Sequence, residues 1–86
     1  MDVRIPTPLR SYTGERARVT AVGTTVAEVL ADLDRQFPGL RFRVVDEQGR
    51  LRQHMKVFVG DESVRDLTTP LDADAEVTLM QALSGG

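Results

Sequence analysis

The chain begins with two stretches in which apolar and polar residues alternate, as they do in strands that bury one face. The first covers residues 3–9 and the second residues 16–22, with a turn signal at Thr13-Gly14 between them. The side chains expected to share the inner face are Val3, Ile5, Thr7, Leu9, Ala17, Val19 and Ala21. The pattern predicts an opening hairpin. Pro6 and Pro8 make the far half of its first strand edge-like, because proline has no backbone donor.

The next stretch has helical periodicity. Its apolar residues recur every three or four positions, at Val26, Val29, Leu30, Leu33 and Phe37. Thr25 and Glu28 form a capping-box pattern, in which each side chain can accept a hydrogen bond from a free backbone N–H at the start of a helix. Pro38-Gly39 is a typical helix end. The pattern predicts one main helix over about Thr25–Phe37.

Beyond this helix the pattern is shorter and less regular. Residues 40–45 fit either a short extended segment or a turn of helix. The remaining expected elements are a turn at 46–49, a strand at 54–59, a turn at 60–61, a short strand at 62–64, a loop at 66–75 and a last strand at 76–81. The order predicts an α+β protein with a single domain over residues 1–82, in which a mixed sheet of four to five strands packs on the main helix. A tail, residues 83–86, follows it.

Composition narrows the classes of function. With 86 residues, 41% of them hydrophobic and 28% charged, the chain fits one small soluble domain. A formal net charge of -2 argues against binding to nucleic acid. The absence of cysteine excludes disulfides, thiolate metal sites and a cysteine nucleophile. Since no apolar signal region or membrane-spanning run is found, we expect a cytoplasmic protein with no membrane partner.

Charged residues are unevenly distributed. Residues 41–56 are mainly basic, and residues 61–76 are mainly acidic. Such asymmetry suits a partner with a basic docking face, because complementary potentials speed the encounter and fix its register. Solvated loops explain the same pattern equally well.

No set of catalytic residues is apparent. His54 is the single histidine, and a serine nucleophile would have to be Ser11, Ser63 or Ser84, none of which has a recognisable flanking motif. The glycines do not form a phosphate-binding motif, and the acids do not have the spacing of a calcium loop. We therefore expect no catalytic residue, no metal site and no bound cofactor.

The sequence ends on Gly85-Gly86. A glycine pair that closes a turn needs chain on both sides, which is not the case here. From the pair alone, a frayed terminus and a functional tail are equally good interpretations.

Residues 77–86 form an apolar strand followed by small residues and a diglycine. This segment resembles the C-terminal segment of proteins in the MoaD/ThiS family of ubiquitin-like sulfur carriers. Residues 61–64 and 71–76 are similar to the loops that precede this strand in the family. Residues 5–10 and Thr13-Gly14 look like the branch that serves cysteine biosynthesis in actinobacteria. The resemblance covers nearly the whole chain and implies a β-grasp fold.

The resemblance also implies a chemistry for the tail. In the family, a ubiquitin-activating-like enzyme uses ATP to adenylate the terminal carboxylate, a sulfur donor converts it into a thiocarboxylate, and a downstream synthase consumes the sulfur. Gly86, preceded by Gly85, would supply that carboxylate. A pyridoxal-phosphate enzyme similar to cysteine synthase is one implied acceptor, and a natural-product enzyme is another. The chain itself would be a co-substrate without a cofactor of its own.

On this interpretation, Met80, Leu83 and Phe58 are candidates for docking a partner. Met80 and Phe58 alternate with the residues assigned to the core, so they either form an exposed apolar patch or pack under a loop. Two rival functions stay open: a protein modifier whose activated tail acylates lysines, and a passive β-grasp interaction module.

Overall fold

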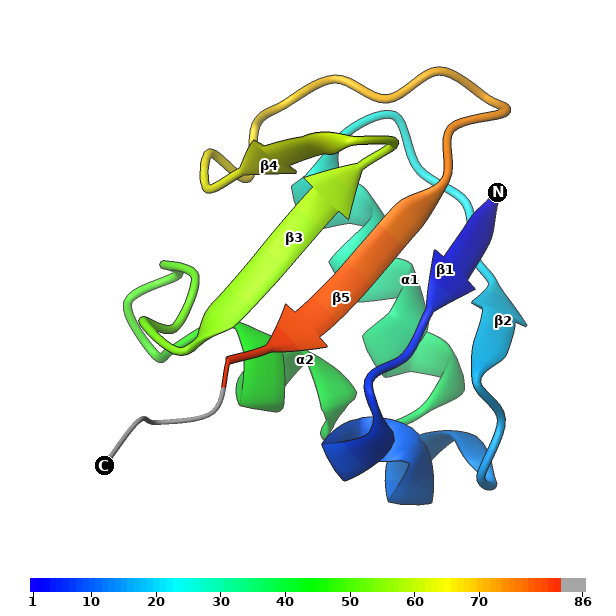
Figure 1. Cartoon of the computed structure of the whole chain (residues 1–86). Coiled ribbons are helices and arrows are strands. Elements are labelled where there is room, and N and C mark those ends of the chain that lie inside the picture. The colour runs from blue at the N-terminus through cyan, green and yellow to red at the C-terminus, as the bar shows by residue number, and fades with distance from the viewer. Residues whose placement is uncertain (83–86) are drawn as a thin grey trace.

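The computed structural model describes residues 1–82 and shows a five-stranded sheet with helices on one side (Figure 1). The strands are β1 (Asp2–Arg4), β2 (Arg18–Thr20), β3 (Met55–Val59), β4 (Glu62–Val64) and β5 (Val77–Gln81). The helices are the 3-10 helix η1 (Thr7–Thr13), α1 (Val26–Gln36) and α2 (Leu40–Val44). The expected α+β class, with one main helix, is confirmed.

The last strand of the chain lies at the centre of the sheet. The strand order is β2-β1-β5-β3-β4, and β5 runs parallel to β1 and antiparallel to β3. The sheet is therefore mixed, as predicted. Strand β5 is therefore hydrogen-bonded to a neighbour on each side, and it ends at Gln81, next to the last described residue.

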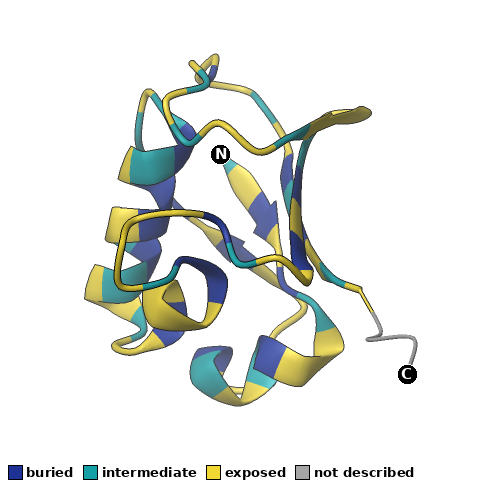
Figure 2. Cartoon of the chain, turned by 90° about the vertical axis from the view of Figure 1, so that its left-hand side faces the viewer, coloured by how far each residue is buried: buried dark blue, intermediate teal, exposed yellow. Residues whose placement is uncertain are grey.

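The core lies between the sheet and the helices (Figure 2). The main helix α1 buries an apolar stripe of Val26, Val29, Leu30 and Leu33 against the inner face of the sheet. The sheet contributes fully buried side chains to the same cluster, namely Val3, Met55, Val57, Val77 and Leu79. No described element covers the opposite face of the sheet, so its outward side chains meet solvent (Figure 1).

Thr25 is the N-cap residue of helix α1, as the capping pattern predicts, but the second hydrogen bond of that pattern is shifted by one residue. The Thr25 hydroxyl accepts a hydrogen bond from the Glu28 N–H at 3.2 Å. The Glu28 carboxylate binds Thr24 rather than Thr25, because the Thr24 N–H and hydroxyl both donate to it at 2.8 Å. The chain before the helix is thus fixed one residue further out than a simple capping box would fix it.

The first predicted strand is too long. Strand β1 ends at Arg4, and residues 7–13 form η1 instead. Pro8 lies in the first turn of η1, where its fixed φ suits a helix and its missing N–H is no loss. Leu9 is nevertheless buried. Strands β1 and β2 pair antiparallel as expected, but through a helical connection rather than a tight hairpin, and Ala17 is exposed.

Residues 40–45, which fitted either an extended or a helical segment, are helical up to Val44, and Val45 is extended. Gly39 takes a left-handed φ of 96° at the start of α2. Leu40 and Val44, one helical turn apart, are both buried, whereas the side chains between them are exposed. The structure thus places Phe42 and Arg43 on the surface of the domain.

Candidate functional site

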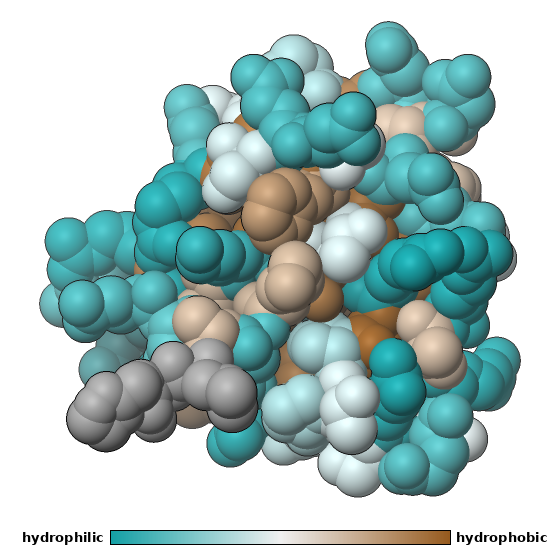
Figure 3. Space-filling view, viewed as in Figure 1, coloured by the Kyte–Doolittle hydropathy of each residue, from teal (hydrophilic) through white to brown (hydrophobic). Residues whose placement is uncertain are grey.

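The outer face of the sheet carries the apolar residues predicted to dock a partner. Along β3 and β5, Met80 pairs with Lys56, and Phe58 pairs with Thr78, so these side chains share the outer face. Met80 is 47% exposed and Phe58 is half-buried. Figure 3 shows apolar side chains gathered over the middle of this face within a hydrophilic rim. Both residues lie where the alternation predicts, and their role in docking stays a prediction.

An open groove runs along the same strand. Strand β1 leaves the sheet after Arg4, whereas β5 continues to Gln81. The space between them is a groove of about 460 Å³, lined by Arg4, Ile5, Pro6, Thr7, Pro8, Arg10, Thr78, Leu79, Met80 and Gln81. The sequence analysis missed this groove because it continued the first strand through the two prolines. The groove follows β5 toward Ala82, and its lining combines apolar residues such as Ile5 and Met80 with Arg4 and Arg10.

Strand β5 leads directly into the proposed tail. The Ala82 N–H donates a hydrogen bond to the His54 carbonyl at 2.7 Å, which extends the β3–β5 pairing past the end of the strand. The predicted sulfur-carrying residues Gly85 and Gly86, and the predicted docking residue Leu83, lie outside the described residues.

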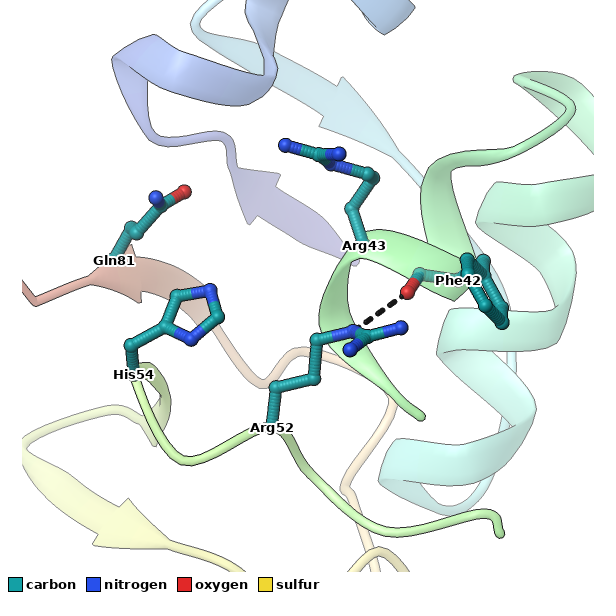
Figure 4. Close-up of a pocket in the computed structure, with 5 residues that line it drawn as sticks. All are labelled: Phe42, Arg43, Arg52, His54 and Gln81. Atoms are coloured by element: carbon teal, nitrogen blue, oxygen red, sulfur yellow. Dashed lines mark hydrogen bonds between the residues drawn. The ribbon is translucent and has the colours of Figure 1, made fainter. Parts of the chain in front are cut away.

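A basic hollow lies beside this corner, and sequence reasoning did not find it. It is lined by Phe42, Arg43, Arg52, His54 and Gln81, which come from α2, the segment before β3, and the end of β5 (Figure 4). We call this set the basic hollow. The signal in the sequence was the excess of basic residues over 41–56, but the fold was needed to bring Arg43 and Arg52 to one place.

Arg52 is held in a fixed position within the basic hollow. Its Nε donates a hydrogen bond to the Phe42 carbonyl at 2.8 Å, and its guanidinium carbon lies 4.8 Å from the centre of the Phe42 ring. Such a contact between a cation and an aromatic face is attractive. The hydrogen bond and the ring contact together pin the Arg52 side chain to helix α2.

The carboxylates with a shifted pKa lie in helix α1 and in two loops, and each is stabilised by local hydrogen bonds. The Thr24 N–H and hydroxyl hold the pKa of Glu28 below its usual value, and the Arg35 guanidinium does the same for Asp32, aided by the Val22 N–H. The backbone N–H groups of Arg50 and Gln48 lower the pKa of Asp46, and the Thr68 hydroxyl and N–H lower that of Asp66. These acids occupy separate local motifs, an arrangement of structural rather than catalytic carboxylates.

Within residues 1–82, no group of three or more His, Cys, Asp or Glu side chains is placed to hold a metal ion. In the same residues, no helix is long and apolar enough to cross a membrane. What the described residues offer chemically is a surface: Met80 and Phe58 on the outer face of the sheet, the groove along β5, and the basic hollow at the end of that strand.

Comparison with known proteins finds a matching family and similar sequences. The family model of the ThiS family matches residues 3–86. Sulfur carrier protein CysO of Mycobacterium tuberculosis and of Mycobacterium bovis is 36% identical over 91 aligned positions, which cover 100% of this chain and 98% of that protein.

Solved structures show the same architecture. The crystal structure of Mycobacterium tuberculosis CysO superposes with a TM-score of 0.90 at 34% identity, covering 95% of this chain and 98% of that one. A chain of the Amycolatopsis orientalis BexX/CysO complex gives 0.92 at 35% identity, covering 99% and 98%. SAMP1 from Haloferax volcanii, a small archaeal modifier protein, gives 0.79 at 31% identity, covering 100% and 98%. With the observed strand order, these likenesses confirm the ubiquitin-like β-grasp fold.

Proposed function

Because this chain belongs to the ThiS family, we propose that it is a sulfur carrier whose Gly86 carboxylate is the group that carries the sulfur. The observation that carries the proposal is the match of the family model over residues 3–86, together with 36% identity to a sulfur carrier protein over the whole chain. The described fold supports it, because β5 is the central strand and leads straight into the matched terminal segment.

The proposed chemistry takes place in two steps. The carboxylate oxygen of Gly86 attacks the α-phosphorus of ATP on a partner enzyme, and pyrophosphate leaves. Sulfide (HS⁻) from the sulfur donor then attacks the acyl carbon and displaces AMP, and loss of its proton leaves a thiocarboxylate. Glycine suits both steps, because no Cβ crowds the acyl carbon and because the backbone of Gly85-Gly86 can follow a narrow channel.

In this function the chain is a co-substrate and not an enzyme. ATP and the sulfur donor are bound by the activating enzyme, and the thiocarboxylate is consumed by a downstream synthase. Similarity to CysO favours an acceptor in cysteine synthesis, with pyridoxal phosphate held by the acceptor enzyme. That a matched chain has been solved in the BexX/CysO complex supports binding to a partner protein. We expect these partners in the cytoplasm, where ATP is supplied.

Intact mass spectrometry tests the proposal. The chain is incubated with ATP, sulfide and the activating enzyme of the same organism, and we expect a mass gain equal to replacement of one oxygen by sulfur. Omission of ATP and deletion of Gly86 are the controls, and both should abolish the gain. A chain that stays unmodified beside an enzyme active on another carrier would contradict the proposal. A passive interaction module predicts instead that deletion of Gly86 has no effect in the cell.

A second candidate function is protein modification, favoured by the likeness to SAMP1. The activated Gly86 would then acylate lysine side chains of target proteins. Adducts of high mass that resist thiol treatment and disappear on deletion of Gly86 would support it. The chain has a single lysine, Lys56, which limits self-linked polymers to one branching position.

A further inference from the structure

The basic hollow lies next to Ala82, the last described residue before the proposed tail. Gln81, the last residue of β5, lines the hollow, and the backbone of His54 at its edge holds Ala82. Because the hollow adjoins Ala82, we expect a partner that binds the tail to cover the hollow as well. The hollow would lose its water when the partner binds.

Covering this hollow with a neutral surface is unfavourable. None of the described residues that line it is acidic, whereas Arg43 and Arg52 are both cationic. The ion pair found within residues 1–82 joins Arg35 and Asp32 of α1, so it involves neither arginine of the hollow. Removing water from a guanidinium without supplying an anion leaves a buried, unpaired charge, which is strongly unfavourable.

The hollow is also prepared to bind a carboxylate. Arg52 uses its Nε for the Phe42 carbonyl, and no described residue accepts a hydrogen bond from its two terminal nitrogens. These nitrogens present a planar pair of donors, which matches the two oxygens of a carboxylate. The ring of Phe42 holds the guanidinium in position, so less side-chain entropy is lost on binding.

We propose that the basic hollow receives an Asp or Glu side chain of the enzyme that activates the tail, and so fixes the orientation of the carrier as its end enters that enzyme. This inference rests on the proposed function. The chain has a net charge of -2, and its segment 61–76 is rich in acids. An acidic residue of the partner is therefore repelled by segment 61–76 and attracted by the two arginines of the hollow.

Charge reversal tests the proposal in the full chain. The variants are Arg43→Glu, Arg52→Glu and the double variant, and affinity for the activating enzyme is measured by calorimetry. We expect each single variant to bind at least about tenfold more weakly and the double variant more weakly still. Arg41→Glu is the matched control, since it makes the same change on the same helix outside the hollow, and should bind within about twofold of the wild type.

Arg43→Glu keeps the test valid if Arg52→Glu disturbs the fold, because the Arg43 side chain makes no hydrogen bond to a described residue. Rising salt should weaken the wild type more than the double variant. Equal affinity of Arg43→Glu and Arg41→Glu would overturn the proposal, and so would tight binding of inorganic phosphate or ATP to the hollow of the isolated chain. The wild-type mass assay separates the two ideas: sulfur transfer with unaffected Arg43→Glu binding refutes the hollow alone, whereas absence of sulfur transfer refutes the function.

Discussion

At the scale of single residues, Gly23 is the most constrained glycine of the described chain. A Cβ built there would lie 2.8 Å from both the Glu28 Cβ and the Val29 nitrogen, closer than atoms can approach without a shift. The segment before α1 crosses the first turn of the helix at this point, where the Glu28 carboxylate also holds Thr24. Glycine is needed here because the backbone itself is the neighbour.

We predict that Gly23→Ala lowers the free energy of unfolding by about 2 kcal/mol, because the clash is with helix backbone that cannot yield easily. Gly49→Ala is the matched control. Its φ of 80° strains an alanine, but a Cβ there meets nothing within 4 Å, so a loss of about 1 kcal/mol is expected. Urea unfolding of both variants measures the difference. Equal losses would show that the close approach to α1 is not restrictive.

At the scale of elements, strand β5 combines a structural and a surface role. Val77 and Leu79 point into the core, and Met80 points away from it beside Lys56. The inward residues fix the strand, so the outward residue can change without loss of the fold.

We predict that Met80→Arg weakens binding to the activating enzyme by about tenfold or more, because it places a charge in the middle of an apolar contact. Phe58→Arg should act in the same direction. Val22→Arg is the control: Val22 is 67% exposed and lies outside the strands, so the same kind of substitution should leave affinity unchanged. Calorimetry gives the affinities, and thermal unfolding verifies the fold. Full affinity in both Met80→Arg and Phe58→Arg would remove this face from the docking surface.

Elements with a strong period could be predicted from the sequence, and those that depend on distant contacts could not. The stripe of α1 and the alternation of β3 and β5 located the core and placed Met80 and Phe58 on the outer face. The helix η1 was missed because Leu9 would be buried in a strand as well as in a helix. A single buried residue does not distinguish the period of a strand from that of a helix. The basic hollow was missed because Arg43 and Gln81 are far apart in the sequence and only the fold brings them together.

At the scale of the whole molecule, four carboxylates in helix α1 and in two loops accept hydrogen bonds from nearby groups. Each of Glu28, Asp32, Asp46 and Asp66 has a pKa lowered by hydrogen bonds that form in the folded chain. A pKa below its unfolded value means that the group stabilises the fold fully above the unfolded pKa. That stabilisation is lost as the pH falls through the folded pKa. We therefore predict that the domain loses stability progressively on acidification below about pH 4.5.

Asp32→Asn should be less stable than the wild type near neutral pH, because the carboxylate accepts hydrogen bonds from Val22, Arg35 and Gln36. The difference should shrink as the pH falls and the wild-type carboxylate takes up a proton. Asp72→Asn, an exposed loop variant, should follow the wild type at every pH. Urea unfolding across the acid range measures all three. A constant difference between Asp32→Asn and the wild type would show that the charge of Asp32 is not what stabilises the fold.

The central position of β5 also determines how the domain resists a pulling force. A protease or unfolding motor that grips the segment after Ala82 has to draw β5 lengthwise from between β1 and β3, to which it is paired over Val3–Arg4 and Met55–Val59. Under such a load many ladder hydrogen bonds are strained together instead of opening one after another from an edge. We therefore expect β5, the strand that precedes the proposed tail, to act as a mechanical clamp that slows unfolding from this end of the domain.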